Sequence, residues 1–304
     1  MLPPFLHSYD LKTQGEDGTY YHTLYHHASV SKAAHTIWWP PVDGEASTPS
    51  TVLLFIPGNP GLLGFYVPFL SAIWKGSAPG LAILAHSYIG HTPGIEPVTG
   101  RKRSASTVGL HVQIQTIIEV LDDIVVTFGT GTKVVLVGHS VGSWLTLQVL
   151  KARPNVVSGT FLLFPTITNI ADTPNGRLLS WLFHPPLPRL VSYASFLVRH
   201  LPHRILLLLF SSWPREQIIV LQSLLQSPST IWASLSMAHE EMGAIREMDI
   251  ALLEEHHEHI WFYFAENDAW VGKHREIILE TMHDMPAGVK VIHGGTDIPH
   301  AFCI

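Results

Sequence analysis

The sequence has little charge, one cysteine and no long hydrophobic run. Asp, Glu, Lys and Arg make up 14% of its 304 residues, with a formal net charge of −6, and no Lys/Arg stripe is clustered enough to suggest a nucleic-acid partner. The single cysteine, Cys303, excludes an intramolecular disulfide and agrees with a reducing compartment. The longest apolar run, residues 205–210, is far shorter than the roughly 20 residues that span a bilayer. We therefore do not expect a membrane-spanning protein.

Two further properties of the sequence concern secretion and the surface of the protein. The N-terminal residues lack a basic segment followed by a long apolar one, so no secretory signal is expected. The mean hydropathy of +0.23 is high for a chain with so little charge. This combination predicts an exposed apolar surface somewhere on the molecule.

A Gly-His-Ser-Val-Gly motif at residues 138–142 follows the four apolar residues 134–137. A β-branched run of this kind predicts a buried parallel strand, and a tight turn after it requires small residues on both sides of Ser140. Residues 143–150 have the apolar content of a helix, which Pro154 would end. Strand, turn and helix in this order are typical of the nucleophile elbow of α/β-hydrolases, which makes Ser140 a candidate nucleophile. The alternative is a glycine-rich turn of some other doubly wound sheet.

Strands and helices alternate along most of the chain. Residues 20–40 predict antiparallel strands, and residues 106–126 have a helical period behind Ser106 as N-cap. The alternation predicts a mostly parallel central sheet with helices on both faces, and together with the elbow motif it predicts an α/β-hydrolase fold. The strands at 160–164 and 259–264 are too far apart in the sequence for one crossover helix, which predicts an inserted helical cap. We expect residues 1–165 and 258–304 to form the core and residues 166–257 the insertion. Further buried strands are predicted at residues 51–56, 81–85, 160–164, 259–264 and 289–293.

The predicted insertion is apolar and cationic. Residues 176–235 contain three tryptophans, no lysine and one acid, Glu216. This pattern predicts a lid or interfacial segment that rests on an anionic lipid surface. The alternative is a buried helical cap with its arginines on the solvent face. The arginines of the segment are Arg177, Arg189, Arg199, Arg204 and Arg215.

Residues 240–258, which follow, contain seven acids. This charge predicts a solvated helix that returns the chain to the core. The histidines within residues 254–259 match no zinc-protease motif, and a solvated polar surface is the better interpretation. We expect neither a metal nor a cofactor.

A serine nucleophile requires a histidine as base and a carboxylate that orients the imidazole. In α/β-hydrolases the partners follow in the order Ser, acid, His, from loops after later strands. Asp268, after the strand at 259–264, is the predicted acid, with Glu266 and Asp172 as rivals. His300, beyond the last strand, is the predicted base, with His293 as its rival.

The oxyanion of such a reaction requires two backbone N–H donors. Val141 follows the nucleophile, and Asn59 lies in the Pro/Gly loop after the strand at 51–56. Since Pro60 has no N–H, Asn59 is the natural second donor. The alternative for residues 57–61 is a plain tight turn.

These motifs resemble those of the lipid droplet-associated hydrolases, a branch of the α/β-hydrolase superfamily. The resemblance covers roughly residues 50–304. It implies that Ser140 is the nucleophile, Asp268 the acid and His300 the base. The matching segments are Phe-Ile-Pro-Gly-Asn-Pro-Gly at 55–61, Phe-Tyr at 65–66, the motif at 138–142, Leu-Phe-Pro-Thr-Ile at 163–167, Thr-Pro-Asn-Gly at 173–176, Asp-Ala-Trp-Val at 268–271 and Ile-Pro-His-Ala-Phe at 298–302.

The resemblance implies serine-ester hydrolysis, with sterol esters as substrates, at the cytoplasmic side of the lipid droplet surface or at the endoplasmic reticulum membrane. It predicts the droplet monolayer as a partner and leaves the oligomeric state open. Family members continue into a closing helix, whereas this sequence ends four residues after His300, which predicts a truncated sequence or impaired activity. A droplet-surface scaffold with little chemistry is the alternative function. An epoxide or haloalkane hydrolase is disfavoured, because those enzymes need an aspartate where this sequence has Ser140.

Overall fold

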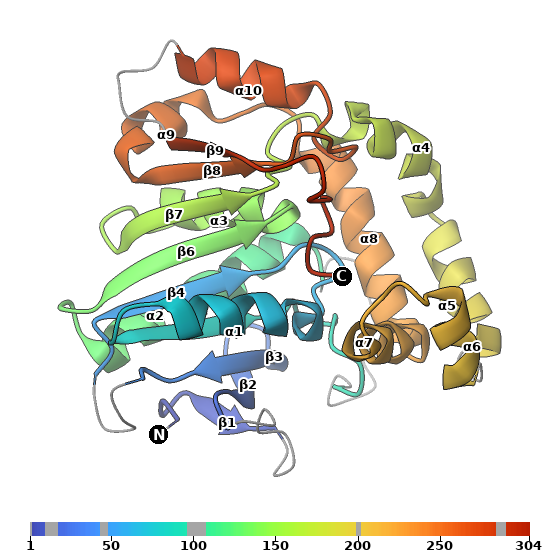
Figure 1. Cartoon of the computed structure of the whole chain (residues 1–304), viewed down its shortest axis with the longest axis horizontal. Helices are drawn as coiled ribbons and strands as arrows, with labels where there is room; N and C mark the ends of the chain where they lie inside the picture. Colours follow the sequence, from blue (N-terminus) through green and yellow to red (C-terminus); the bar gives the residue numbers. More distant parts are fainter. Residues whose placement is uncertain (1, 10–17, 43–47, 96–107, 199–201, 284–289) are drawn as a thin grey trace.

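The computed structural model describes residues 2–9, 18–42, 48–95, 108–198, 202–283 and 290–304. They form one nine-stranded sheet in the order β1-β2-β3-β5-β4-β6-β7-β8-β9. Helices cover both faces of the sheet, and a further group of helices lies beyond one end of the strands (Figure 1).

The sheet has an antiparallel edge and a parallel remainder, as the sequence predicts. β1 (Leu6–Ser8), β2 (Tyr21–His27) and β3 (Lys32–Trp39) pair antiparallel with one another, and β3 also pairs antiparallel with β5. The other six strands are parallel, so their carboxyl ends meet at one edge. They are β4 (Thr51–Ile56), β5 (Leu81–His86), β6 (Lys133–His139), β7 (Val157–Leu163), β8 (Ile260–Phe264) and β9 (Lys290–His293).

Two apolar clusters pack against opposite faces of the sheet. Because side chains alternate along a strand, Val52 and Leu54 of β4 join one cluster while Leu53 and Phe55 join the other. The first cluster includes residues of α2 and α3, and the second includes Leu70 of α1. The core helices are α1 (Val67–Gly76), α2 (Leu110–Phe128), α3 (Val141–Ala152), α9 (Ile250–Glu255) and α10 (His274–His283).

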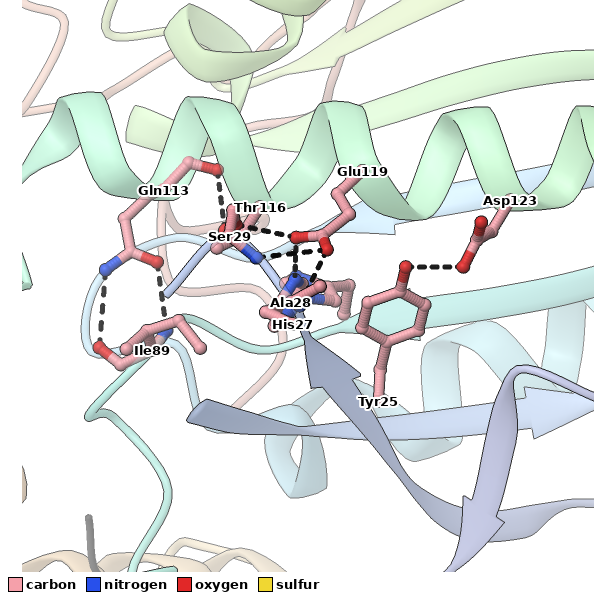
Figure 2. Close-up of polar contacts among 10 residues, drawn as sticks. Tyr25, His27, Ala28, Ser29, Ile89, Gln113, Thr116, Glu119 and Asp123 are labelled. Atoms are coloured by element: carbon pink, nitrogen blue, oxygen red, sulfur yellow. Dashed lines mark hydrogen bonds and ion pairs between the residues drawn. The ribbon is translucent and has the colours of Figure 1, made fainter. Parts of the chain in front are cut away.

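Polar side chains of α2 fix this helix to the loops of the sheet (Figure 2). The Gln113 amide donates to the Ile89 carbonyl at 3.3 Å and accepts from the Ile89 N–H at 2.9 Å. Glu119 accepts from the Ala28 N–H at 2.8 Å, in the turn between β2 and β3. The helix begins at Leu110 after Gly109, later than predicted, and Ser106 lies outside the described residues.

Of the helices between β7 and β8, the five from α4 to α8 lie together beyond the carboxyl ends of the strands (Figure 1). None of the helices within the described ranges is long and apolar enough to cross a membrane. The five are α4 (Pro174–Phe183), α5 (Leu187–Val198), α6 (His203–Leu209), α7 (Arg215–Leu225) and α8 (Pro228–Ala244).

The acidic stretch 240–258 was predicted as a solvated helix, and the structure corrects this in two respects. Helix α8 ends at Ala244, α9 begins at Ile250, and between them the Arg246 carbonyl accepts from the Asn169 N–H at 2.8 Å. Glu241 is buried, with 4% of its surface exposed. The number of acids in the stretch does not reveal this burial, because it depends on how α8 packs: Met237 and Ala238 on the same helix are buried as well.

Candidate active site

Ser140 occupies a sharp turn between β6 and α3, and its backbone has the strained angles φ 54° and ψ −122°. The Ser140 N–H donates to the Leu163 carbonyl at the end of β7, at 2.9 Å. Glycines are required on both sides: a Cβ on Gly138 would overlap the Gly142 carbonyl, and a Cβ on Gly142 would overlap the Ile56 carbonyl. The turn therefore holds the serine hydroxyl above the edge of the sheet.

Side chains from two later loops reach this hydroxyl in series. His300 Nε2 lies 2.9 Å from Ser140 Oγ, and His300 Nδ1 lies 2.7 Å from Asp268 Oδ2. The other carboxyl oxygen of Asp268 accepts from the N–H groups of Trp270 at 2.8 Å and Val271 at 3.1 Å. These two amides fix the carboxylate so that Oδ2 accepts from Nδ1–H. That leaves His300 Nε2 as the acceptor for the serine proton.

The rival residues lie elsewhere. Glu266 is exposed two residues before Asp268. The Asp172 side chain is 63% exposed and lies 3.9 Å from an Arg177 nitrogen. His293 Nδ1 contacts Arg275 at 2.9 Å. Among the described residues, no group of three or more His, Cys, Asp or Glu side chains is arranged to hold a metal ion.

His139, the residue before Ser140 in the motif, links three loops of the site. Its Nδ1 accepts from the Tyr66 hydroxyl at 2.8 Å, and its Nε2–H donates to the His300 carbonyl at 3.0 Å. The Tyr66 oxygen in turn accepts from the Gly58 N–H at 2.9 Å. Burial lowers the pKa of His139 and raises the pKa of Tyr66, so both remain neutral. Sequence analysis assigned no role to either residue, because the contact joins positions 73 residues apart.

The predicted oxyanion donors belong to two segments that adjoin Ser140. A Cβ on Gly58 would be 3.1 Å from the Ser140 Cβ, so the loop after β4 runs directly against the turn. Asn59, the next residue, lines the adjoining cavity. Val141 is the first residue of α3, where an N–H has no acceptor within the helix.

A cavity of about 360 Å³ adjoins Ser140 and His300. The core contributes the loop after β4, the elbow and the last residues of the chain, while α7 and α8 contribute the opposite wall. Most of its side chains are apolar, as in a site for a lipid-like ligand. They include Leu62, Phe65, Ile170, Phe183, Leu235 and Met242.

Glu241 is the lining residue that sequence analysis missed. Its Oε1 accepts from the Asn59 side-chain N–H at 2.9 Å, and the same amide donates to the Ser234 carbonyl at 2.9 Å. Helix α8 is thereby tied to the loop that carries the predicted oxyanion donor. Burial raises the pKa of Glu241 to about 7, against the lowering effect of the Asn59 hydrogen bond, and the neighbouring Glu240 raises it further.

This carboxyl group predicts a pH-dependent change in stability. The pKa of Glu241 rises from 4.5 in the unfolded chain to about 7 in the folded chain, so its stabilising contribution is complete below pH 4.5 and is lost as the pH rises through 7. Glu241→Gln keeps the acceptor for Asn59 but does not ionise. Relative to this variant, the wild type should lose about 3 kcal/mol between pH 4.5 and pH 8. Melting temperatures of both proteins at pH 5 and pH 8 test this, and a constant difference between them would contradict it.

Comparison with known protein families shows which family the chain belongs to. A family model described as lipid-droplet associated hydrolase matches residues 49–303. The chain belongs to the lipid droplet-associated hydrolase family. The lipid droplet-associated hydrolase of Pongo abelii is 32% identical over 284 residues, covering 86% of this chain and 82% of that protein. The human one is 31% identical over 282 residues with the same coverage, and that of Drosophila melanogaster is 27% identical over 253 residues, covering 78% and 80%.

Solved structures confirm the α/β-hydrolase fold of this lipid droplet-associated hydrolase family member. A carboxylesterase structure from Nitrososphaera gargenis aligns with a TM-score of 0.59 at 12% identity, covering 92% of both chains. An epoxide hydrolase from Vigna radiata aligns with a TM-score of 0.63 at 15% identity, covering 94% of this chain and 93% of that one. Because these neighbours differ in their reactions, the fold alone does not select the chemistry.

Proposed function

We propose that this hydrolase cleaves carboxylic esters of lipids through an acyl-enzyme intermediate, with Ser140 as nucleophile, His300 as general base and acid, and Asp268 as the orienting carboxylate. The observation that carries the proposal is the hydrogen-bonded series from Ser140 through His300 to Asp268 at the wall of an apolar cavity. A neutral imidazole at 2.9 Å from the hydroxyl can accept its proton as the oxygen attacks.

The reaction follows from the same atoms. Ser140 Oγ attacks the ester carbonyl carbon while its proton passes to His300 Nε2, and the N–H groups of Asn59 and Val141 hold the oxyanion. The tetrahedral intermediate collapses as His300 returns the proton to the departing alcohol, which leaves an acyl group on Ser140. Water, deprotonated by His300, then attacks the acyl carbon. As the second tetrahedral intermediate collapses, the bond to Ser140 Oγ breaks, His300 returns the proton to Oγ, and the carboxylic acid is released.

We further propose that the substrates are sterol esters and that the protein acts at the lipid droplet surface. The names of the relatives support droplet association. Purified protein should react with a fluorophosphonate probe, and an emulsified cholesteryl ester should slow this reaction and be hydrolysed. Absence of labelling would contradict the serine hydrolase, whereas labelling without hydrolysis of the sterol ester would contradict only the substrate.

The insertion, which we assign to residues 166–257, is the proposed lipid-contacting segment. Its exposed apolar side chains favour an interfacial surface over a buried cap, because a cap would bury them. Its arginines 177, 189, 204 and 215 are also exposed and suit an anionic monolayer. We define the lid surface as the exposed Leu178, Trp181, Leu190, Tyr193, Phe196, Leu197, Ile205, Leu208, Leu209 and Ile219.

Polar substitutions on the lid surface should weaken droplet binding. Leu197 and Leu208 are 83% and 77% exposed, so serine at these positions leaves the folded core intact. Each substitution removes a leucine side chain that would otherwise enter the lipid, and this lowers the affinity for the droplet about tenfold. The double variant should therefore bind phospholipid-coated triolein droplets about a hundredfold more weakly in a flotation assay, and hydrolyse a short soluble ester at the wild-type rate. Val126→Ser, at an 82% exposed position on α2, is the matched control. An equal loss in the control would contradict a specific lid surface.

A droplet-surface scaffold with little chemistry is the second candidate function, since the exposed lid surface could serve adhesion without catalysis. The two candidates differ in one measurement. A scaffold binds droplets but shows no serine labelling, whereas the hydrolase is labelled in solution.

A further inference from the structure

A single acidic side chain interrupts the apolar wall of the cavity. Among the described residues that line the cavity, Glu241 is the one whose side chain carries a carboxyl group. The residue is 4% exposed, and its neighbours on the same helix, Leu235, Ala238 and Met242, present apolar side chains to the same space. A carboxyl group in such surroundings is costly unless its oxygens are hydrogen-bonded.

Within the described part of the chain, one of the two oxygens of this carboxyl group has a hydrogen-bond donor. Oε1 accepts from Asn59 at 2.9 Å, whereas Oε2 has no hydrogen-bond partner among the described residues. Glu241 is one of the residues that line the cavity, so a ligand in this space can reach its carboxyl group. The adjoining open space is the cavity that contains Ser140 and His300.

We propose that this hydrolase selects lipid esters that carry a hydroxyl group, and that Glu241 is the specificity-determining residue that hydrogen-bonds this hydroxyl through Oε2. Partial acylglycerols and esters of hydroxy fatty acids belong to this class. A sterol ester belongs to it when its acyl chain or its sterol carries a further hydroxyl group, so the inference narrows the proposed sterol esters to these. The inference rests on the proposed function and deepens it, because it names a feature of the substrate beyond the ester bond.

The chemistry of the cavity favours a hydroxyl over other donors. An ammonium group would have to leave water for an apolar space with one partner, and the desolvation of two charges offsets their attraction. A hydroxyl group costs far less to bury and can donate to an ionised carboxyl group or pair with a protonated one. A substrate without the hydroxyl leaves Oε2 unpaired, which is the physical basis of the selection.

The test compares matched esters that differ by hydroxyl groups. One pair is a monoacylglycerol and the propyl ester of the same acid, and the other is the methyl ester of a hydroxy fatty acid and that of its parent acid. For wild type, kcat/KM should favour the hydroxylated member of at least one pair by about tenfold. Glu241→Met, which has similar size and no hydrogen-bonding oxygen, should bring this ratio close to one. Any loosening of Asn59 affects both members of a pair alike and cancels in the ratio.

Two further variants separate recognition from a structural effect. Glu241→Gln retains a hydrogen-bonding group and should keep the preference, and Leu235→Met changes the same wall of the cavity without touching the carboxyl group and should also keep it. A ratio that is the same in wild type and Glu241→Met for both pairs overturns the proposal. So does a preference for an amino analogue over the hydroxyl ester.

A binding measurement keeps this inference distinct from the hydrolase assignment. The matched ethers, a monoalkylglycerol and the corresponding alkyl propyl ether, cannot be cleaved. The glycerol ether should raise the melting temperature of wild type more than the propyl ether does, and Glu241→Met should lose this difference. If the glycerol ether shows this effect and the protein does not react with fluorophosphonate, the cavity selects hydroxyl groups and the proposed hydrolysis is wrong. Equal shifts for these two ethers in wild type, and equal shifts for a hydroxy fatty acid methyl ester and its parent ester bound to Ser140→Ala, overturn the inference whatever the activity.

Discussion

Ser140→Ala should abolish ester hydrolysis, with a loss of about 10⁴ to 10⁶ in kcat. The alanine variant keeps the cavity but has no oxygen to form the acyl intermediate. What remains is the contribution of the oxyanion donors and of binding to direct attack by water. Labelling by a fluorophosphonate probe should disappear with the hydrolysis, because the probe reacts with the same activated oxygen.

A second serine of the cavity provides the control. Ser234 lines the same space, but its hydroxyl donates to the Thr230 carbonyl at 2.8 Å and has no contact with His300. Ser234→Ala should therefore retain labelling. Labelling of Ser140→Ala at the wild-type rate would show that another nucleophile reacts, and the proposed mechanism would be wrong.

Asp268→Asn should lower kcat by about 10⁴ while the protein stays folded. The amides of Trp270 and Val271 donate to Oδ1, so an asparagine keeps its oxygen there and turns its NH₂ toward His300. Two donors then face each other unless Nδ1 loses its proton. The imidazole must adopt the tautomer with hydrogen on Nε2, which cannot accept the proton of Ser140.

The two other acids considered from the sequence are matched controls for this variant. Glu266→Gln and Asp172→Asn remove one negative charge each at exposed positions near the same loops. Both should retain kcat within about twofold, since surface charges have small effects. Steady-state kinetics on one soluble ester compares the three variants. A loss of 10⁴ in Glu266→Gln instead of Asp268→Asn would reassign the carboxylate.

The candidate triad residues could be predicted from the sequence, either from a local motif or from their position after a strand. Ser140 is recognisable because the backbone of the turn demands glycine on both sides, which leaves a fixed spacing. Asp268 and His300 are recognisable because parallel strands bring their following loops to one edge, so position after a strand predicts proximity. Predicting that these loops lie at one edge did not require the order of the strands in the sheet.

The residues that escaped prediction depend on contacts between distant segments. Glu241 belongs to an acidic stretch that is typical of a solvated helix, and only the packing of α8 over the loop after β4 buries it. The pairing of Tyr66 with His139 likewise requires the loop after β4 to meet β6. On α2, Gln113 is a polar residue on the buried face of the helix, and its side-chain amide hydrogen-bonds the backbone N–H and carbonyl of Ile89. Periodicity and charge patterns describe one element at a time and carry no signal of such contacts.

The hydrogen bonds from Gly58 through Tyr66 and His139 to His300 make the reacting side of the cavity preorganised. The loop after β4, the turn at Ser140 and the loop that carries His300 share these bonds, so a displacement of one strains the other two. Adaptation to ligands of different shape is thereby left to the facing helices, α7 and α8. If the proposed hydrolysis is correct, substitutions on those two helices should change the acyl-chain preference while leaving the proposed triad untouched.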